Sequence, residues 1–73
     1  MSGLRKRSVS LSGHATSVAL EPEFWSLIED EAAERDLPLA ALLIEIDQTR
    51  GRRSLASACR LRALARARAL PPG

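Results

Sequence analysis

The chain has 73 residues, 45% of them apolar, but it contains one Trp, one Phe and no Tyr, so any core consists mostly of small aliphatic side chains. A single cysteine excludes an internal disulfide, and one cysteine with one histidine falls short of the four ligands of a structural zinc site. A chain this short rarely builds a stable core alone, so we expect a partner chain to complete it.

The net charge of +2 hides three blocks of charge. Residues 1–20 contain three basic and no acidic side chains, and residues 21–47 contain all nine carboxylates with a single arginine. Residues 48–73 contain seven arginines and no acid. This asymmetry indicates either that the basic ends bind a polyanion or that they attract the acidic middle of the same chain.

No segment indicates a membrane-bound or exported protein. No apolar run approaches the roughly 18 residues that cross a bilayer, and the basic N-terminal segment leads into an alternating pattern instead of an apolar stretch. The lone thiol of Cys59 fits a packed side chain in a reducing compartment. We therefore expect a cytoplasmic protein that does not bind membranes.

Residues 1–7 are predicted to form a flexible basic arm, because they offer nothing to bury. Alternating segments follow on both sides of Gly13, with apolar residues on odd numbers before it and on even numbers after it. A strand changes faces only at a bulge or a turn, and glycine permits either. We expect one strand from about 14 to 20, preceded by a looser extended segment.

Three helices are predicted after this strand. The first begins at Pro22, since proline suits the first helical position, and ends before a second proline-containing break. The second spans about 38–49. The third starts near Ser54, whose hydroxyl can cap it, and its end over 65–73 is expected to fray into a basic tail. Residues 8–64 then form the folded domain.

The second predicted helix is apolar nearly all round. Such a helix must be covered on both sides, and a lone strand leaves unpaired edges. Both features predict a mostly α-helical, intertwined homodimer in which residues 14–20 of two chains pair as an intersubunit, two-stranded antiparallel ribbon. The expected dimer core consists of Val18, Leu20, Phe24, Leu27, Ile28, Leu39, Leu42, Leu43 and Ile46.

No group of residues forms a recognisable catalytic site. His14 lies on the predicted strand without a suitably spaced nucleophile, and the glycines are too scattered to cradle a phosphate. We expect a binding module, with no metal, and not an enzyme. An intersubunit ribbon is the geometry with which β-ribbon proteins enter the DNA major groove, and its solvent face would present Ala15, Ser17 and Ala19.

Several runs of residues follow a family pattern. They are Lys6-Arg7-Ser8-Val9, Gly13-His14, Thr16-Ser17-Val18, Leu20-Glu21-Pro22-Glu23-Phe24-Trp25, Ala32-Ala33-Glu34-Arg35, Glu45-Ile46-Asp47 and Arg50-Gly51. With these runs the chain resembles the short ribbon-helix-helix proteins of α-proteobacteria over roughly residues 6–64. The resemblance implies an obligate dimer that binds operator DNA in transcriptional regulation and uses no cofactor.

The resemblance also implies site residues. It assigns Ala15, Ser17 and Ala19 to the groove-facing side of the ribbon, where members commonly have arginine first and a hydroxyl residue last. Two alanines at these positions weaken the expected base readout, because alanine makes only methyl contacts.

Phosphate contacts are expected at two places. The resemblance assigns the start of the second helix to phosphate binding, where the backbone amides of Leu39 and Ala40 are the remaining donors. The charge pattern adds the basic run before the ribbon, a second set of phosphate contacts. Its residues are Arg5, Lys6 and Arg7.

We therefore predict a sequence-specific, repressor-like transcriptional regulator that binds double-stranded DNA as a homodimer. The alternative is a protein-interaction adaptor, or an antitoxin that combines both functions, whose arginine-rich third helix grips an acidic protein partner. The same arginines would otherwise neutralise the acidic middle of their own chain. They are Arg60, Arg62, Arg66 and Arg68.

Overall fold

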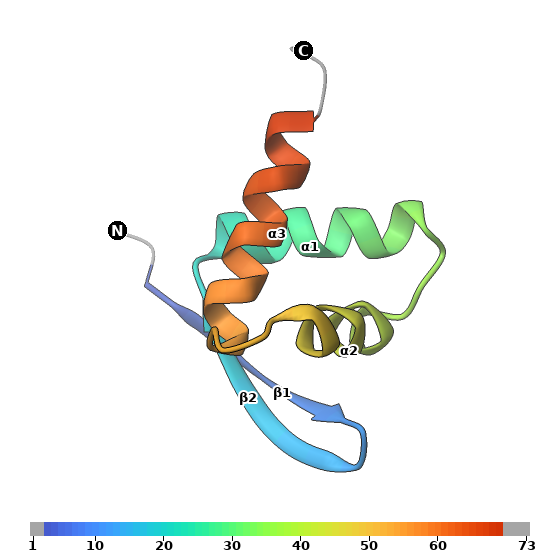
Figure 1. Ribbon diagram of the computed structural model, residues 1–73. Helices are drawn as coiled ribbons and strands as arrows, with labels where there is room; N and C mark the ends of the chain where they lie inside the picture. The colour runs from blue at the N-terminus through green and yellow to red at the C-terminus, as the bar shows by residue number, and fades with distance from the viewer. Residues whose placement is uncertain (1–2, 70–73) are drawn as a thin grey trace.

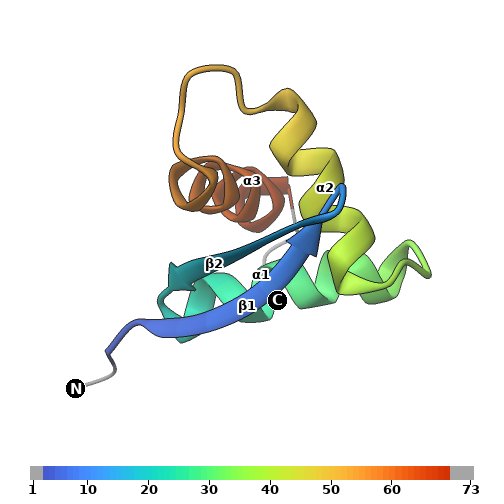
Figure 2. The same cartoon turned by 90° about the horizontal axis from the view of Figure 1, so that it is seen from below.

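A computed structural model describes residues 3–69 of the chain (Figures 1 and 2). Its elements in chain order are β1 (Arg5–Leu11), β2 (His14–Leu20), α1 (Pro22–Glu34), α2 (Leu39–Thr49) and α3 (Leu55–Ala69). The two strands form a hairpin on one side of the helices, and α3 runs from beside β2 across α1 to the opposite end of the molecule (Figure 1). No helix in this described part is long and apolar enough to cross a membrane.

The hairpin is the main difference from the sequence prediction. The expected lone strand has a partner in its own chain, because β1 pairs antiparallel with β2 from Arg5 opposite Leu20 to Leu11 opposite His14. Ser12 and Gly13, with φ of +51° and +85°, form the two-residue turn. Positive φ at both positions suits the twist of the flanking strands. The prediction of one strand per chain is therefore wrong.

The register of the hairpin explains why the apolar residues change from odd to even numbers at Gly13. Odd-numbered residues of β1 lie opposite even-numbered residues of β2, so Leu11 shares a face with Val18 and Leu20. These three side chains are buried against the helices. The two apolar patterns belong to one face of a hairpin and do not belong to one bulged strand.

Trp25 of α1 ties β1 to the helices. Its side chain is 1% exposed, and its indole Nε1 donates a hydrogen bond to the backbone oxygen of Arg5 over 2.8 Å. Because a buried indole N–H needs an acceptor, this bond fixes the start of β1. The segment predicted as a flexible arm is thus ordered strand from Arg5 onward.

Helix α2 is partly covered within a single chain. The hairpin and α3 both pack on it, and α3 contributes the fully buried Cys59 and Ala63, whose small side chains let the helices approach closely. One chain therefore buries Leu42, Leu43 and Ile46 of α2, whereas Leu39 and Ile44 of the same helix are only partly buried. Of the predicted core, Val18, Leu20, Ile28, Leu42, Leu43 and Ile46 are buried, and Phe24, Leu27 and Leu39 are partly buried.

Helix α3 begins as predicted and extends further. The backbone N–H of Ser57 donates to Ser54 Oγ over 3.1 Å, which confirms Ser54 as the cap. The helix continues to Ala69, so residues 65–69, which were expected to fray, are helical. Residues 70–73 of the predicted tail lie outside the described part of the chain.

Candidate nucleic-acid interface

One face of the hairpin points away from the helices. Because side chains alternate along a strand and Val18 and Leu20 are buried, the residues between and before them face outward. Ala15 and Ser17 are exposed and Ala19 is half-buried. The pairing places Ser10, Ser8 and Lys6 of β1 opposite these three residues. We call this surface the outer sheet face: Lys6, Ser8, Ser10, Ala15, Ser17 and Ala19.

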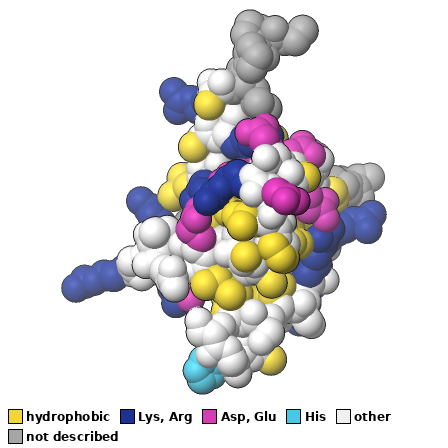
Figure 3. Space-filling view, turned by 90° about the vertical axis from the view of Figure 1, so that its right-hand side faces the viewer, with side chains coloured by type: hydrophobic (Ala, Val, Ile, Leu, Met, Phe, Trp, Pro, Cys, Tyr) yellow, Lys and Arg dark blue, Asp and Glu magenta, His cyan; other side chains and the backbone are white. Residues whose placement is uncertain are grey.

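The outer sheet face is small, polar and free of acidic groups. Neither strand contains a carboxylate. Figure 3 shows the end of the hairpin as a mainly white surface marked by the single histidine, His14, while acidic and basic side chains are spread over the rest of this view. Carboxylates would repel the DNA backbone, and this surface holds none.

The basic run of β1 is divided between the two faces of the sheet. The guanidinium of Arg7 lies 4.6 Å from the ring centroid of Trp25, and its Nη1 donates to Glu29 Oε2 of α1 over 2.7 Å. Arg7 therefore faces the helices, and Arg5, two residues before it, has the same orientation. Of the three predicted phosphate contacts, Lys6 belongs to the outer sheet face.

The start of α2 keeps its predicted donors. Pro38 precedes the helix without a side-chain cap, and its carbonyl oxygen accepts hydrogen bonds from the amides of Ala41 and Leu42 over 3.0 and 3.3 Å. Within residues 3–69 the amides of Leu39 and Ala40 have no backbone acceptor outside the helix. They are oriented like the first amides of any helix, and their role in phosphate binding stays a prediction.

Most arginines of α3 bind the acids of their own chain. Arg60 Nε donates to Glu21 Oε1 over 2.9 Å, and Arg66 Nη2 donates to Glu34 Oε2 over 2.9 Å. These hydrogen bonds from the arginines lower the pKa of both carboxyls below their usual value. Of the two explanations for the blocks of charge, attraction between the basic end and the acidic middle holds for these arginines.

A larger ion-pair cluster joins all three helices. Arg62 Nη2 of α3 lies 2.6 Å from Glu31 Oε2 of α1 and 2.7 Å from Glu45 Oε2 of α2. Arg35 binds both carboxylates as well. Burial alone would raise the pKa of Glu31, but hydrogen bonds from Arg62 and Arg35 lower it below its usual value. Those from Arg35 and Arg62 lower the pKa of Glu45 to about 2.

The sequence reasoning missed Glu31, which is 7% exposed and the one buried charged residue among those described. Its position next to the buried Ala32 was the available signal, because a polar residue at the edge of an apolar stripe needs a partner when the helix is covered. One partner, Arg35, lies four residues further on, but the closer one, Arg62, is distant in sequence.

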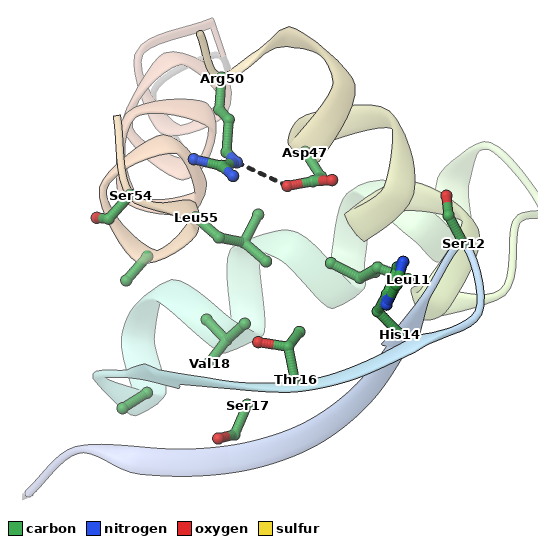
Figure 4. Close-up of a pocket in the computed structure, with 12 residues that line it drawn as sticks. Leu11, Ser12, His14, Thr16, Ser17, Val18, Asp47, Arg50, Ser54 and Leu55 are labelled. Carbon is green, nitrogen blue, oxygen red and sulfur yellow. Dashed lines mark hydrogen bonds and ion pairs between the residues drawn. The ribbon is translucent and has the colours of Figure 1, made fainter. Parts of the chain in front are cut away.

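The second edge of β2 is unpaired among the described residues, since the sheet contains only β1 and β2. A groove of about 540 Å³ lies between β2 and the junction of α2 with α3. Figure 4 shows Thr16, Val18 and Leu55 directed into this groove, with the bond from Arg50 Nε to Asp47 Oδ1, 2.6 Å, at its far side. The groove thus offers an open strand edge beside a surface that is partly apolar.

Comparison with known protein families gives one match. A profile described as ribbon-helix-helix domain matches residues 4–67, which include both strands, α1, α2 and most of α3. Neither the search of curated proteins nor the search of solved structures gave a significant match. Because the profile spans nearly the whole chain and the matched segment folds into a strand hairpin followed by helices, the protein belongs to the ribbon-helix-helix domain family.

Proposed function

We propose that this chain is a DNA-binding transcriptional regulator, acting as a repressor, that contacts duplex DNA with the outer sheet face. Ribbon-helix-helix domains are typically DNA-binding regulators or antitoxins. The observation that carries the proposal is the outer sheet face itself, an exposed strand surface with small side chains, three serines, one lysine and no carboxylate. Small side chains let a strand approach base edges closely, and the major groove, about 12 Å wide, admits a two-stranded ribbon.

The proposal includes a homodimer formed through β2. Members of the family usually form dimers, and the unpaired edge of β2 supports this assembly. The residues beside a two-residue turn form a hydrogen-bonded pair, and pair types alternate along the strands. By this alternation the backbone groups of Ala15, Ser17 and Ala19 face the open edge. Pairing of two β2 strands would satisfy these groups and place the strand order β1-β2-β2-β1 across the dimer.

Ser17→Pro tests the dimer. Proline removes one N–H from the open edge of β2 and none from the hairpin ladder. We expect Ser17→Pro to shift the purified chain from dimer to monomer in analytical ultracentrifugation, while Ser17→Ala remains dimeric. A wild-type chain that sediments as a monomer at micromolar concentration would overturn the proposed assembly.

Selection from random duplexes tests DNA binding. We expect repeated binding to the wild-type chain to enrich a two-fold symmetric sequence, because a symmetric dimer reads two half-sites. Ala15→Glu adds a carboxylate to the outer sheet face and should weaken binding to the enriched duplex at least about tenfold. Ala67→Glu on α3 makes the same change at an exposed helical position and should leave binding nearly unchanged. No enrichment above the starting pool contradicts a sequence-specific regulator.

The adaptor or antitoxin alternative receives less support. It requires the arginines of α3 to grip an acidic partner, but Arg60, Arg62 and Arg66 already bind carboxylates of their own chain. A partner would have to compete with these intramolecular pairs. We therefore place the proposed function on the sheet and not on α3.

A further inference from the structure

The polar groups of the outer sheet face come mainly from β1. β2 contributes two alanines and Ser17, whereas β1 contributes Lys6, Ser8 and Ser10, each exposed. Alanine contacts a thymine methyl but forms no hydrogen bond with a base or a phosphate. The sequence pattern did not predict β1 as a strand. β1 nevertheless provides most of the side-chain donors and acceptors of the outer sheet face and its only cation.

Strand spacing places β1 at the margin of the proposed interface. Neighbouring strands lie about 4.8 Å apart, so in the order β1-β2-β2-β1 the two β1 strands are about 14 Å apart. The major groove is about 12 Å wide. The two β2 strands therefore fit within the groove, and the two β1 strands lie over its walls, where the phosphates are.

Arg7, which follows Lys6 along β1, cannot take its place. The guanidinium of Arg7 is held on the opposite face of the sheet by the Trp25 ring and Glu29. Lys6 pairs with Ala19 across the hairpin and has no ion pair among the residues that the structure describes. Its ammonium thus extends from the outer sheet face without a competing carboxylate.

We propose that Lys6 is the phosphate contact of the sheet, one on each side of the major groove, and that β1 holds the protein on the DNA while β2 lies over the bases. This inference rests on the proposed DNA-binding function. It assigns the DNA affinity of the sheet to Lys6 of β1, although β2 is the strand that enters the groove. Arg7 then has a structural role.

The salt dependence of binding tests this assignment. Each phosphate contact contributes about 0.9 to the slope of log K against log salt concentration. With two copies of Lys6 in the dimer, Lys6→Gln should make the slope less steep by about 2 on the enriched duplex and on an unrelated duplex alike. Lys6→Arg should preserve the wild-type slope.

Arg68→Gln is the matched control. It removes the same charge from the last turn of α3, at the end of the molecule opposite the hairpin (Figure 1), and should leave the slope unchanged. Circular dichroism of every variant excludes a change of fold. Equal slopes for wild type and Lys6→Gln would overturn this inference alone, whereas a wild-type chain that binds no duplex would overturn the proposed function together with it.

Discussion

Basic residues have opposite roles on the outer sheet face and on α3. Helix α3 has more of them, but Arg60, Arg62 and Arg66 each bind an acid of α1, α2 or the segment between β2 and α1. The outer sheet face has only Lys6, without a carboxylate on either strand. The number of cations therefore does not locate a candidate nucleic-acid site. The two regions differ in whether the protein already neutralises their cations.

The largest expected effect comes from detaching the hairpin from the helices. Trp25→Ala removes a fully packed ring and the hydrogen bond to Arg5 that attaches β1 to α1. We expect a loss of about 3–5 kcal/mol in the free energy of unfolding, enough to unfold much of so small a domain. Urea unfolding followed by circular dichroism measures it.

Trp25→Phe separates the two contributions of this side chain. It keeps most of the ring burial and loses the indole donor, so about 1 kcal/mol is expected from the unpaired Arg5 oxygen and the smaller ring. Equal stability of Trp25→Ala and wild type would show that the hairpin is not anchored at this position.

The next largest effect tests the ion-pair cluster that fixes α3. Glu31→Gln removes the more buried of the two carboxylates that Arg62 and Arg35 share. A loss of about 1–3 kcal/mol in the free energy of unfolding is expected. Glu29→Gln is the control, because its bond to Arg7 is exposed and such pairs contribute at most about 1 kcal/mol. Similar losses in both variants would contradict a special role for Glu31.

The same cluster predicts a pH dependence. The pKa of Glu45 falls to about 2 in the folded chain, and those of Glu21, Glu31 and Glu34 are also lowered. The folded state then binds fewer protons than the unfolded state, so its stability rises with pH in this range. The contribution is complete above about pH 4.5, the ordinary value, and is lost as the pH falls toward 2.

Thermal unfolding between pH 2 and 7 measures this dependence. Glu45→Gln should flatten the acid side of the curve, because it removes the carboxyl with the lowest pKa. A midpoint that does not change between pH 5 and 2 would contradict ion pairing between the helices.

The smallest effect is expected at the turn. Gly13 has φ of +85° and open space where a Cβ would lie, so Gly13→Ala imposes backbone strain without a clash. A cost of about 1 kcal/mol follows from the positive φ alone. Gly3→Ala, also in open space, should cost almost nothing and serves as the control.

Local patterns in the sequence predicted the helices but not their long-range partners. The breaks at Pro22 and Pro38 and the cap at Ser54 depend on neighbouring residues, and the helices begin within a residue or so of these positions. The parity change at Gly13 was visible as well, but a bulge, a turn and a second chain all account for it. Only the pairing of β1 with β2 decides among them, and pairing depends on contacts that local patterns do not encode.

For the same reason, the sequence predicted only part of the candidate site. The alternation along β2 correctly placed Ala15 and Ser17 on an exposed face. Lys6 and Arg7 lie on opposite faces of the sheet because β1 is a strand. The sequence pattern had not predicted this strand. Once Lys6 and Arg7 alternate across a sheet, one is free for a ligand and the other stacks on Trp25.

Titration of the isotope-labelled chain with the enriched duplex, followed by amide chemical shifts, tests the central claim most directly. If the sheet is the DNA-binding surface, the largest changes occur at Lys6, Ser8 and Ser17, and those of α3 from Arg60 to Arg68 stay small. The largest changes on α3, with the sheet unaffected, would contradict the account and place binding on the arginine-rich helix.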